Sequence, residues 1–142
     1  MRILDFMFPL ERRFKLIDKK NKEMAKTLII GASENPARYS FLAANMLLAN
    51  GHQIALLGKK PGFIKGIPIQ TGHPELKEID TVTMYIGPLN QPHLYQYIID
   101  LHPRRVIFNP GTENEEFSSL LSAKDIQTEE ACTLVLLRIG MY

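Results

Sequence analysis

The sequence predicts an α/β protein, a Rossmann-like three-layer sandwich in which helices cover both faces of a mostly parallel sheet of about five strands. From residue 27 onward, short apolar runs alternate with segments of helical periodicity in the order β-α-β-β-α-β-α-β. The first run, residues 27–30, is short and unbroken, as expected for a parallel strand that is buried on both faces. A turn that contains glycine follows each of the first four runs, which ends each strand.

Local signals set the bounds of each element. The expected strands are residues 27–30, 53–57, 80–86, 105–108 and 126–128, with a turn-rich stretch over residues 58–66. The expected helices are residues 36–49, 90–101, 112–124 and 131–138, with one helical turn over residues 74–77; a strand is the alternative for residues 131–138. Asn35 is expected to cap the first helix, with Pro36 in its first turn and Gly51 after its end. Thr112 and Glu115 have the spacing of a capping box.

Residues 1–23 differ from the rest of the chain and are assigned to an N-terminal extension, ahead of one domain over residues 24–142. Apolar residues at helical spacing are interspersed with Lys and Arg, which describes a basic amphipathic helix interrupted by Pro9. A membrane-surface or partner-binding helix is one interpretation. The favoured alternative is that translation can start at Met24, three residues before the first strand, and that the upstream residues are an over-long gene model or a loose appendage.

Composition excludes several classes of protein. Residues 27–142 hold nine Lys or Arg and eleven Asp or Glu, so the body of the chain lacks the broad basic face that nucleic-acid binding needs. No apolar run approaches the ~20 residues of a transmembrane helix. The single cysteine, Cys132, rules out an internal disulfide and favours a reducing, cytoplasmic setting. The four histidines are scattered without metal-ligand spacing, so no metal is expected.

The unusual residues of the chain follow the predicted strands, where ligands bind in parallel sheets. The candidate site residues after the four strands are Gly31, Ala32 and Ser33; Gly58, Lys59 and Lys60; Tyr85, Ile86, Gly87 and Pro88; and Asn109, Pro110 and Gly111.

The turn after the first strand is a candidate phosphate site. Gly31 lets a pyrophosphate approach the backbone, while Ser33 and the N–H groups at the start of the helix can donate hydrogen bonds to it. Arg38 adds positive charge and Ser40 a further donor. The alternative is a tight strand-to-helix turn without a ligand, because the full G-x-G-x-x-G pattern is absent.

The end of the second strand narrows the choice of ligand. An NAD-binding domain usually has an acidic residue here, which holds the ribose hydroxyls. This chain has Lys59 and Lys60 instead, which suit a phosphate on the ribose and favour coenzyme A or NADP over NAD. The alternative is a pair of solvated turn lysines.

These segments resemble a known family, the small stand-alone coenzyme A-binding domain proteins, which are related to the coenzyme A-binding half of the α subunit of succinyl-CoA synthetase. The resemblance covers residues 26–142 and rests on five segments: the G-A-S-x-N-P turn at residues 31–36 with Arg38-Tyr39-Ser40; residues 58–60; residues 80–82 with 85–88; residues 109–115; and Glu130-Ala131-Cys132. The turn after the second strand lacks the family's usual proline, and the fourth strand lacks its aromatic-Gln pair.

The resemblance implies coenzyme A or an acyl-CoA as the ligand, with NADP as the less favoured cofactor. It implies that the adenosine lies across the second and third strands, that Lys59 or Lys60 is near the 3′-phosphate, and that Gly31 and Ser33 hold the pyrophosphate. Cys132 falls where the family often has a cysteine.

The residues themselves offer no convincing catalytic machinery. Glu129 and Glu130 disfavour a thiolate at Cys132, which is interpreted as a buried structural cysteine; redox exchange with the thiol of coenzyme A is the alternative. His73 and His93 have no evident acid–base partner.

Three functions therefore stay open. The leading prediction is non-catalytic binding of coenzyme A or an acyl-CoA. The alternatives are a small NADP-linked oxidoreductase or nucleotide sensor, and a protein-interaction module with a vestigial pocket. A homodimer is a further open expectation, since exposed strand edges in small sheets often pair.

Overall fold

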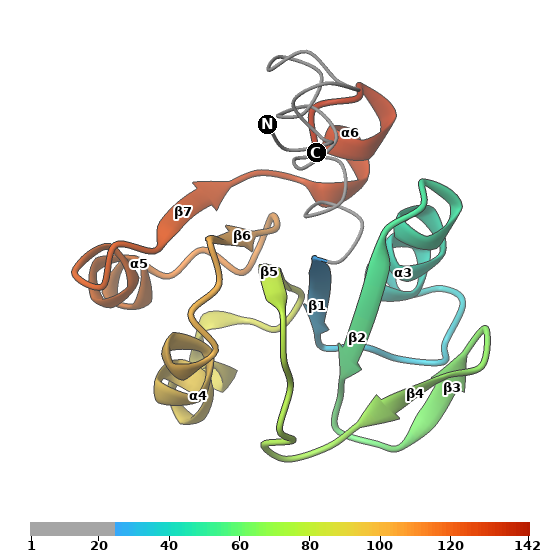
Figure 1. Ribbon diagram of the computed structural model, residues 1–142, viewed down its shortest axis with the longest axis horizontal. Helices are drawn as coiled ribbons and strands as arrows, with labels where there is room; N and C mark the ends of the chain where they lie inside the picture. The colour runs from blue at the N-terminus through green and yellow to red at the C-terminus, as the bar shows by residue number, and fades with distance from the viewer. Residues whose placement is uncertain (1–24) are drawn as a thin grey trace, which may run out of the picture.

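The sheet has more strands than the sequence predicts. The structure, a computed structural model, describes residues 25–142, and the expected N-terminal extension lies outside them. Within these residues, seven strands form one sheet in the order β3-β4-β2-β1-β5-β6-β7 (Figure 1). The strands are β1 Lys26–Ile30, β2 Gln53–Leu57, β3 Gly62–Ile64, β4 Ile67–Gln70, β5 Ile79–Met84, β6 Arg105–Phe108 and β7 Gln127–Glu130. All neighbouring strands pair in parallel except β3, which is antiparallel to β4.

Helices cover both faces of the sheet, so the predicted three-layer α/β architecture is confirmed. The helices α3 (Tyr39–Ala49) and α6 (Thr133–Arg138) pack on one face, and α4 (Tyr95–Asp100) and α5 (Glu115–Ser122) pack on the other (Figure 1). Successive residues of β1 serve both layers. Leu28 packs in the core beneath α4 and α5, and Ile29 in the core beneath α3. Burial on both faces is the reason that β1 is continuously apolar from Leu28 to Ile30. Among residues 25–142, no helix is long and apolar enough to cross a membrane.

The sheet extends from β1 in both directions. The strands β2, β4 and β3 lie on one side of β1, and β5, β6 and β7 on the other. The switch in strand order is therefore between β1 and β5, and in open parallel sheets the ligand crevice lies at this switch, beyond the carboxyl ends of the strands.

The two additional strands form a hairpin in the stretch where the sequence predicts only turns. Lys65 and Gly66 occupy its two-residue loop with φ angles of 48° and 80°, as in a type I′ turn. Because the loop has lysine instead of the usual asparagine or aspartate, the sequence lacks the strongest hairpin signal. The helical turn expected over residues 74–77 is wrong, since these residues have no regular structure.

The expected N-terminal caps of two helices are wrong, whereas Gly51 follows the end of α3 as expected, with a φ of 81°. Asn35 accepts a hydrogen bond from the N–H of Ala37 at 3.0 Å in a turn that ends before α3 begins. The hydroxyl of Thr112 donates to the carbonyl of Asn109, and Asn114 caps α5 by accepting from the N–H of Phe117 at 2.9 Å. Both errors have the same cause: several short polar side chains precede each helix, and only the path of the loop decides which one reaches the free N–H groups.

The helix expected over residues 90–101 is broken at its start. Two 3₁₀ turns, η1 (Pro88–Asn90) and η2 (Pro92–Leu94), precede α4. Pro92 has no N–H to continue an α-helix through residue 91. The break places the side chain of Gln91 between the two turns, where it is fully buried.

Candidate functional site

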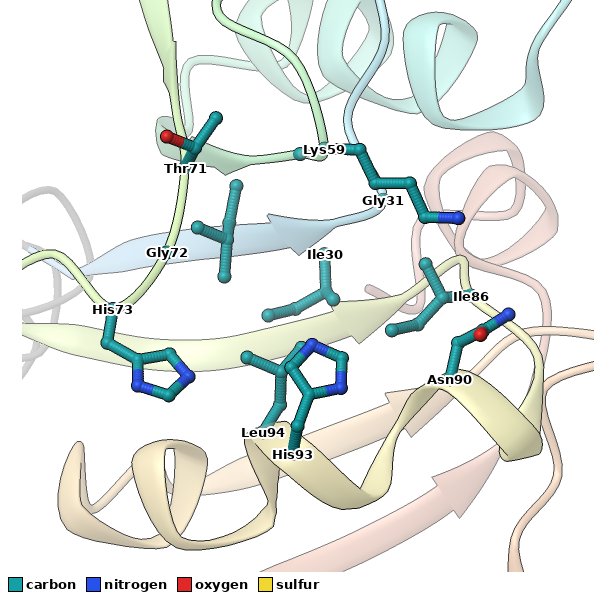
Figure 2. Close-up of a pocket in the computed structure, with 12 residues that line it drawn as sticks. Ile30, Gly31, Lys59, Thr71, Gly72, His73, Ile86, Asn90, His93 and Leu94 are labelled. Carbon is teal, nitrogen blue, oxygen red and sulfur yellow. The ribbon is translucent and has the colours of Figure 1, made fainter.

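Two connected hollows lie at the carboxyl edge of the sheet. The larger is a polar cleft of about 560 Å³, lined by Gly31, Ala32, Ser33, Glu34, Asn35, Arg38, Tyr39, Ser40, Lys59, Lys60, Pro61, Ile69, Tyr85, Ile86, Pro110 and Thr112. The smaller is a mainly apolar cavity of about 230 Å³, lined by Ile30, Gly31, Leu57, Gly58, Lys59, Thr71, Gly72, His73, Ile86, Asn90, His93 and Leu94 (Figure 2). They share Gly31, Lys59 and Ile86, so one elongated ligand could occupy both.

The turn after β1 is held against its neighbours by close backbone packing. Gly31 has a φ of 93°, and a Cβ there would lie 2.9 Å from Cγ2 of Ile86 and 3.1 Å from the carbonyl oxygen of Tyr85. The N–H groups of Gly31 and Ala32 both donate to the carbonyl of Leu57, at 2.9 and 3.0 Å. Glycine is therefore required where the three loops meet. The N–H groups of Gly31 and Ala32 already have a partner within the protein, so they are not available to a ligand.

Donors for an anion come from the next residues of the same loop. The hydroxyl of Ser33 accepts from the N–H of Asn35 at 3.1 Å, which leaves its own proton free to donate outward. Tyr39 and Ser40 begin α3, and the first N–H groups of a helix have no partner within the helix. Arg38, immediately before α3, contributes a positive charge.

Positive charge is concentrated at the end of β2. Lys59 and Lys60 both line the cleft and are exposed, and Figure 2 shows the Lys59 side chain extending past Gly31. The one carboxylate among the cleft residues, that of Glu34, accepts a hydrogen bond from the N–H of Phe63 at 2.6 Å, so it is held against the β3–β4 hairpin. No acidic residue stands at the end of β2, where a ribose-binding acid would be needed for NAD.

The apolar cavity has a largely aliphatic interior with two imidazoles beside it. Ile30, Leu57 and Leu94 come from the core, and His73 and His93 lie on the same side of the cavity (Figure 2). His73 stacks on Tyr97, with ring centroids 4.9 Å apart and an interplanar angle of 12°. The Tyr97 hydroxyl donates to the carbonyl of Pro74 at 2.6 Å, which fixes that ring in turn.

Asn109 has a structural role that the sequence did not predict. It is 2% exposed, and its amide donates to the hydroxyl of Thr83 at 2.7 Å and to the carbonyl of Met84 at 2.8 Å. Its side-chain oxygen accepts from the N–H of Thr133 at 2.9 Å. Asn109 thus ties the ends of β5 and β6 to the start of α6, and lines neither hollow.

Tyr85 presents a neutral aromatic wall to the cleft. Its burial raises the pKa of the phenol to about 12, against the weaker opposing effect of the nearby Thr133 hydroxyl. The phenol therefore stays protonated at physiological pH. Neighbouring Pro110 and Thr112 add no charge to this end of the cleft.

The structure brings together most of the predicted site residues. Twelve of them line one or both hollows: Gly31, Ala32, Ser33, Arg38, Tyr39, Ser40, Gly58, Lys59, Lys60, Tyr85, Ile86 and Pro110. Five line neither: Gly87, Pro88, Asn109, Gly111 and Cys132. Cys132 is a free, half-buried thiol immediately before α6.

Sequence reasoning missed several lining residues. Pro61, Ile69 and Thr71 belong to or adjoin the hairpin that was not predicted. Thr112 was assigned to a helix cap and Asn90 to a helix. Pro92 is the sequence signal that would have placed Asn90 before the break, whereas the β3–β4 hairpin has no strong signal in the sequence. Within residues 25–142, no group of three His, Cys, Asp or Glu side chains could hold a metal ion.

This architecture defines a Rossmann-like α/β domain with a polar cleft at the switch in strand order. Residues 25–138 match the family described as the CoA binding domain, and the chain belongs to that family.

Solved structures support the same assignment of fold. An uncharacterized protein with a known crystal structure is 47% identical to this chain, with a TM-score of 0.81. The alignment covers 84% of this chain and 98% of that protein. A Thermus thermophilus protein is 16% identical, with a TM-score of 0.75 and coverage of 90% and 98%. A hypothetical protein from Pyrococcus horikoshii is 18% identical, with a TM-score of 0.73 and coverage of 99% and 96%. Among curated proteins, none matches this chain.

Proposed function

We propose that the protein binds coenzyme A or an acyl-CoA across the two connected hollows and does not itself catalyse a reaction. The observation that carries the proposal is the position of Lys59 and Lys60 at the end of β2, beside the cleft and the apolar cavity. A ribose 3′-phosphate at this place would meet two cations, whereas a free ribose diol would find no acidic partner.

The ligand has one orientation that matches the chemistry of the walls. The adenine occupies the apolar cavity beside His73 and His93, and the pyrophosphate lies at Ser33, Arg38 and the start of α3. An elongated ligand with these two anchors continues away from the lysines. It therefore passes the uncharged walls at Tyr85 and Pro110.

Strand spacing supports this direction. The lysines follow β2, and Pro110 follows β6, three places further along the sheet. At ~4.8 Å per strand the two ends of the cleft are about 14 Å apart, which separates the charged end of coenzyme A from its pantetheine arm.

Isothermal titration calorimetry on the full chain tests the proposal with coenzyme A, acetyl-CoA, 3′-dephospho-coenzyme A, NADP and NAD. We expect coenzyme A or acetyl-CoA to bind most tightly and NAD to bind most weakly. Preference for NADP over both CoA species would favour the oxidoreductase or sensor. Absence of heat with all five ligands at millimolar concentration would favour an interaction protein with a vestigial pocket.

A further inference from the structure

Gln91 is a buried polar side chain behind the wall of the proposed ligand site, and it lines neither hollow. Its side chain is 0% exposed, although it lies in the loop between η1 and η2. Its amide nitrogen donates to the carbonyl of Ile86 at 2.9 Å and to the carbonyl of Thr112 at 2.8 Å. Its amide oxygen accepts from the side-chain nitrogen of Asn114 at 2.9 Å.

These bonds join two loops that are far apart in the sequence. Ile86 follows β5 and lines both hollows, while Thr112 follows β6 and lines the polar cleft. Asn114 extends the connection, because its amide also donates to the hydroxyl of Tyr95 at 2.8 Å while its oxygen caps α5. A single amide thus connects the loop between the two hollows with the far wall of the cleft.

Only an amide side chain suits the two carbonyls that Gln91 bonds. Burying a polar side chain is unfavourable unless its groups are satisfied, and a methionine of similar size would fill the same volume without that requirement. An NH₂ group can donate to two carbonyls at once, which neither an apolar chain nor a carboxylate can do.

We infer that Gln91 is a positioning residue for coenzyme A: it sets the distance between the loops at Ile86 and Thr112, and with it the width of the cleft where the pantetheine arm lies. The inference rests on the proposed function. It adds a residue that does not touch the ligand and acts through the two carbonyls that it holds.

The test compares Gln91→Glu and Gln91→Met with the wild type, by calorimetry with coenzyme A between pH 6 and pH 8. Gln96→Glu is the matched control, since Gln96 lies on exposed α4 surface and bonds only to Asp100 among the described residues, at 2.8 Å. Gln91→Met should weaken binding about tenfold at every pH, the equivalent of ~1.4 kcal/mol.

Gln91→Glu should behave differently. An ionised carboxylate has no proton for either carbonyl, whereas the protonated form can donate to one of them. Affinity should therefore be lowest at pH 8 and should recover partly towards pH 6. The titratable groups nearby are His93 on η2, Tyr95 on α4, and Glu113 and Glu115 at the start of α5. These groups are present in every variant. Their effect on the pH dependence of affinity is therefore removed by comparing Gln91→Glu with the wild type and with Gln96→Glu.

A ligand fragment separates positioning from general destabilisation. Adenosine 3′,5′-bisphosphate lacks the pantetheine arm, so Gln91→Met should weaken it less than coenzyme A; equal losses would overturn the inference. Unchanged binding of coenzyme A by both Gln91 variants would also overturn it. If the wild type binds no coenzyme A, the proposed function fails first.

Asn114→Asp keeps the inference testable if the Gln91 variants do not fold. Aspartate preserves the oxygen that caps α5 and removes the N–H that holds Gln91. We expect the same direction of change with coenzyme A and a smaller change with the fragment. Wild-type affinity for both would contradict the assigned role.

Discussion

Gly58 passes so close beneath Ala32 that a Cβ at position 58 would overlap the carbonyl oxygen of Ala32. The same Cβ would lie 2.9 Å from Cγ2 of Ile69. The loops after β1 and β2 therefore meet through a position that only glycine can occupy, between the polar cleft and the apolar cavity.

We expect Gly58→Ala to lower the free energy of unfolding by about 1–3 kcal/mol, the usual cost of overpacking, and to weaken coenzyme A binding because the Lys59 loop is displaced. Urea unfolding and calorimetry measure the two effects. Gly51→Ala is the control: its φ of 81° makes alanine unfavourable, yet nothing lies within 4 Å of the added Cβ. This control should lose stability and keep its affinity, whereas equal affinity in both variants would contradict the role of Gly58.

The two lysines at the end of β2 provide a direct test of the ribose phosphate. Lys59→Ala combined with Lys60→Ala should weaken coenzyme A by about tenfold or more, since each contact between opposite charges is worth roughly 1 kcal/mol near a surface. The same variant should hardly change binding of 3′-dephospho-coenzyme A. Lys77→Ala with Lys124→Ala removes equal charge from residues that line neither hollow, and serves as the control. Equal losses for both ligands would refute the assigned phosphate contact.

Asn109 is expected to matter for stability more than for binding chemistry. Asn109→Ala removes three buried hydrogen bonds and leaves the N–H of Thr133 and the carbonyl of Met84 without this partner. We expect a loss of about 2–4 kcal/mol in the free energy of unfolding. Asn50→Ala, which removes one exposed bond to Met46, should cost under about 1 kcal/mol in the same urea titration. Similar costs for the two variants would show that the buried network contributes little.

Asp80 should affect stability in acid. Burial opposes its ionisation, but hydrogen bonds from Arg104 and Thr81 outweigh that effect and lower its pKa below the ordinary value of 3.8. A lowered folded-state pKa contributes stability that is complete above pH 3.8 and is lost as the pH falls through the folded-state pKa.

The difference in unfolding free energy between the wild type and Asp80→Asn should therefore shrink as the pH falls from 7 to below 3.8. Urea titrations at several pH values measure it. Asp100→Asn, at the end of α4, is the control, and a constant difference across the range would argue against the Arg104 pairing.

The sequence predicted the fold better than it predicted the details of the loops. The strands at residues 53–57 and 105–108 were placed correctly because each is apolar after its first residue, as is usual for buried parallel strands. The final helix was also found within its expected range. The β3–β4 hairpin was missed because its loop is Lys65-Gly66 and its strands are only three and four residues long.

The candidate site divides in the same way. Local signals identified Gly31 and Lys59, since each follows a clear strand. The same reasoning grouped Asn109 with them, and its side chain instead points into the interior of the domain, where it makes three hydrogen bonds to β5 and to the start of α6.

By itself, the sequence determined the parallel α/β architecture. It predicted, from the turns after the strands and from Lys59 and Lys60, a ligand edge of the sheet and coenzyme A as the ligand. Periodicity and turn chemistry are local, so one chain suffices to show them. The tertiary structure alone decided which polar residues face the cleft and which bond to the protein. The side chains of Gln91 and Asn109 bond to partners 21 to 26 residues away, apart from one bond of Gln91 to the nearby carbonyl of Ile86, and only the folded loops bring those atoms within hydrogen-bonding distance.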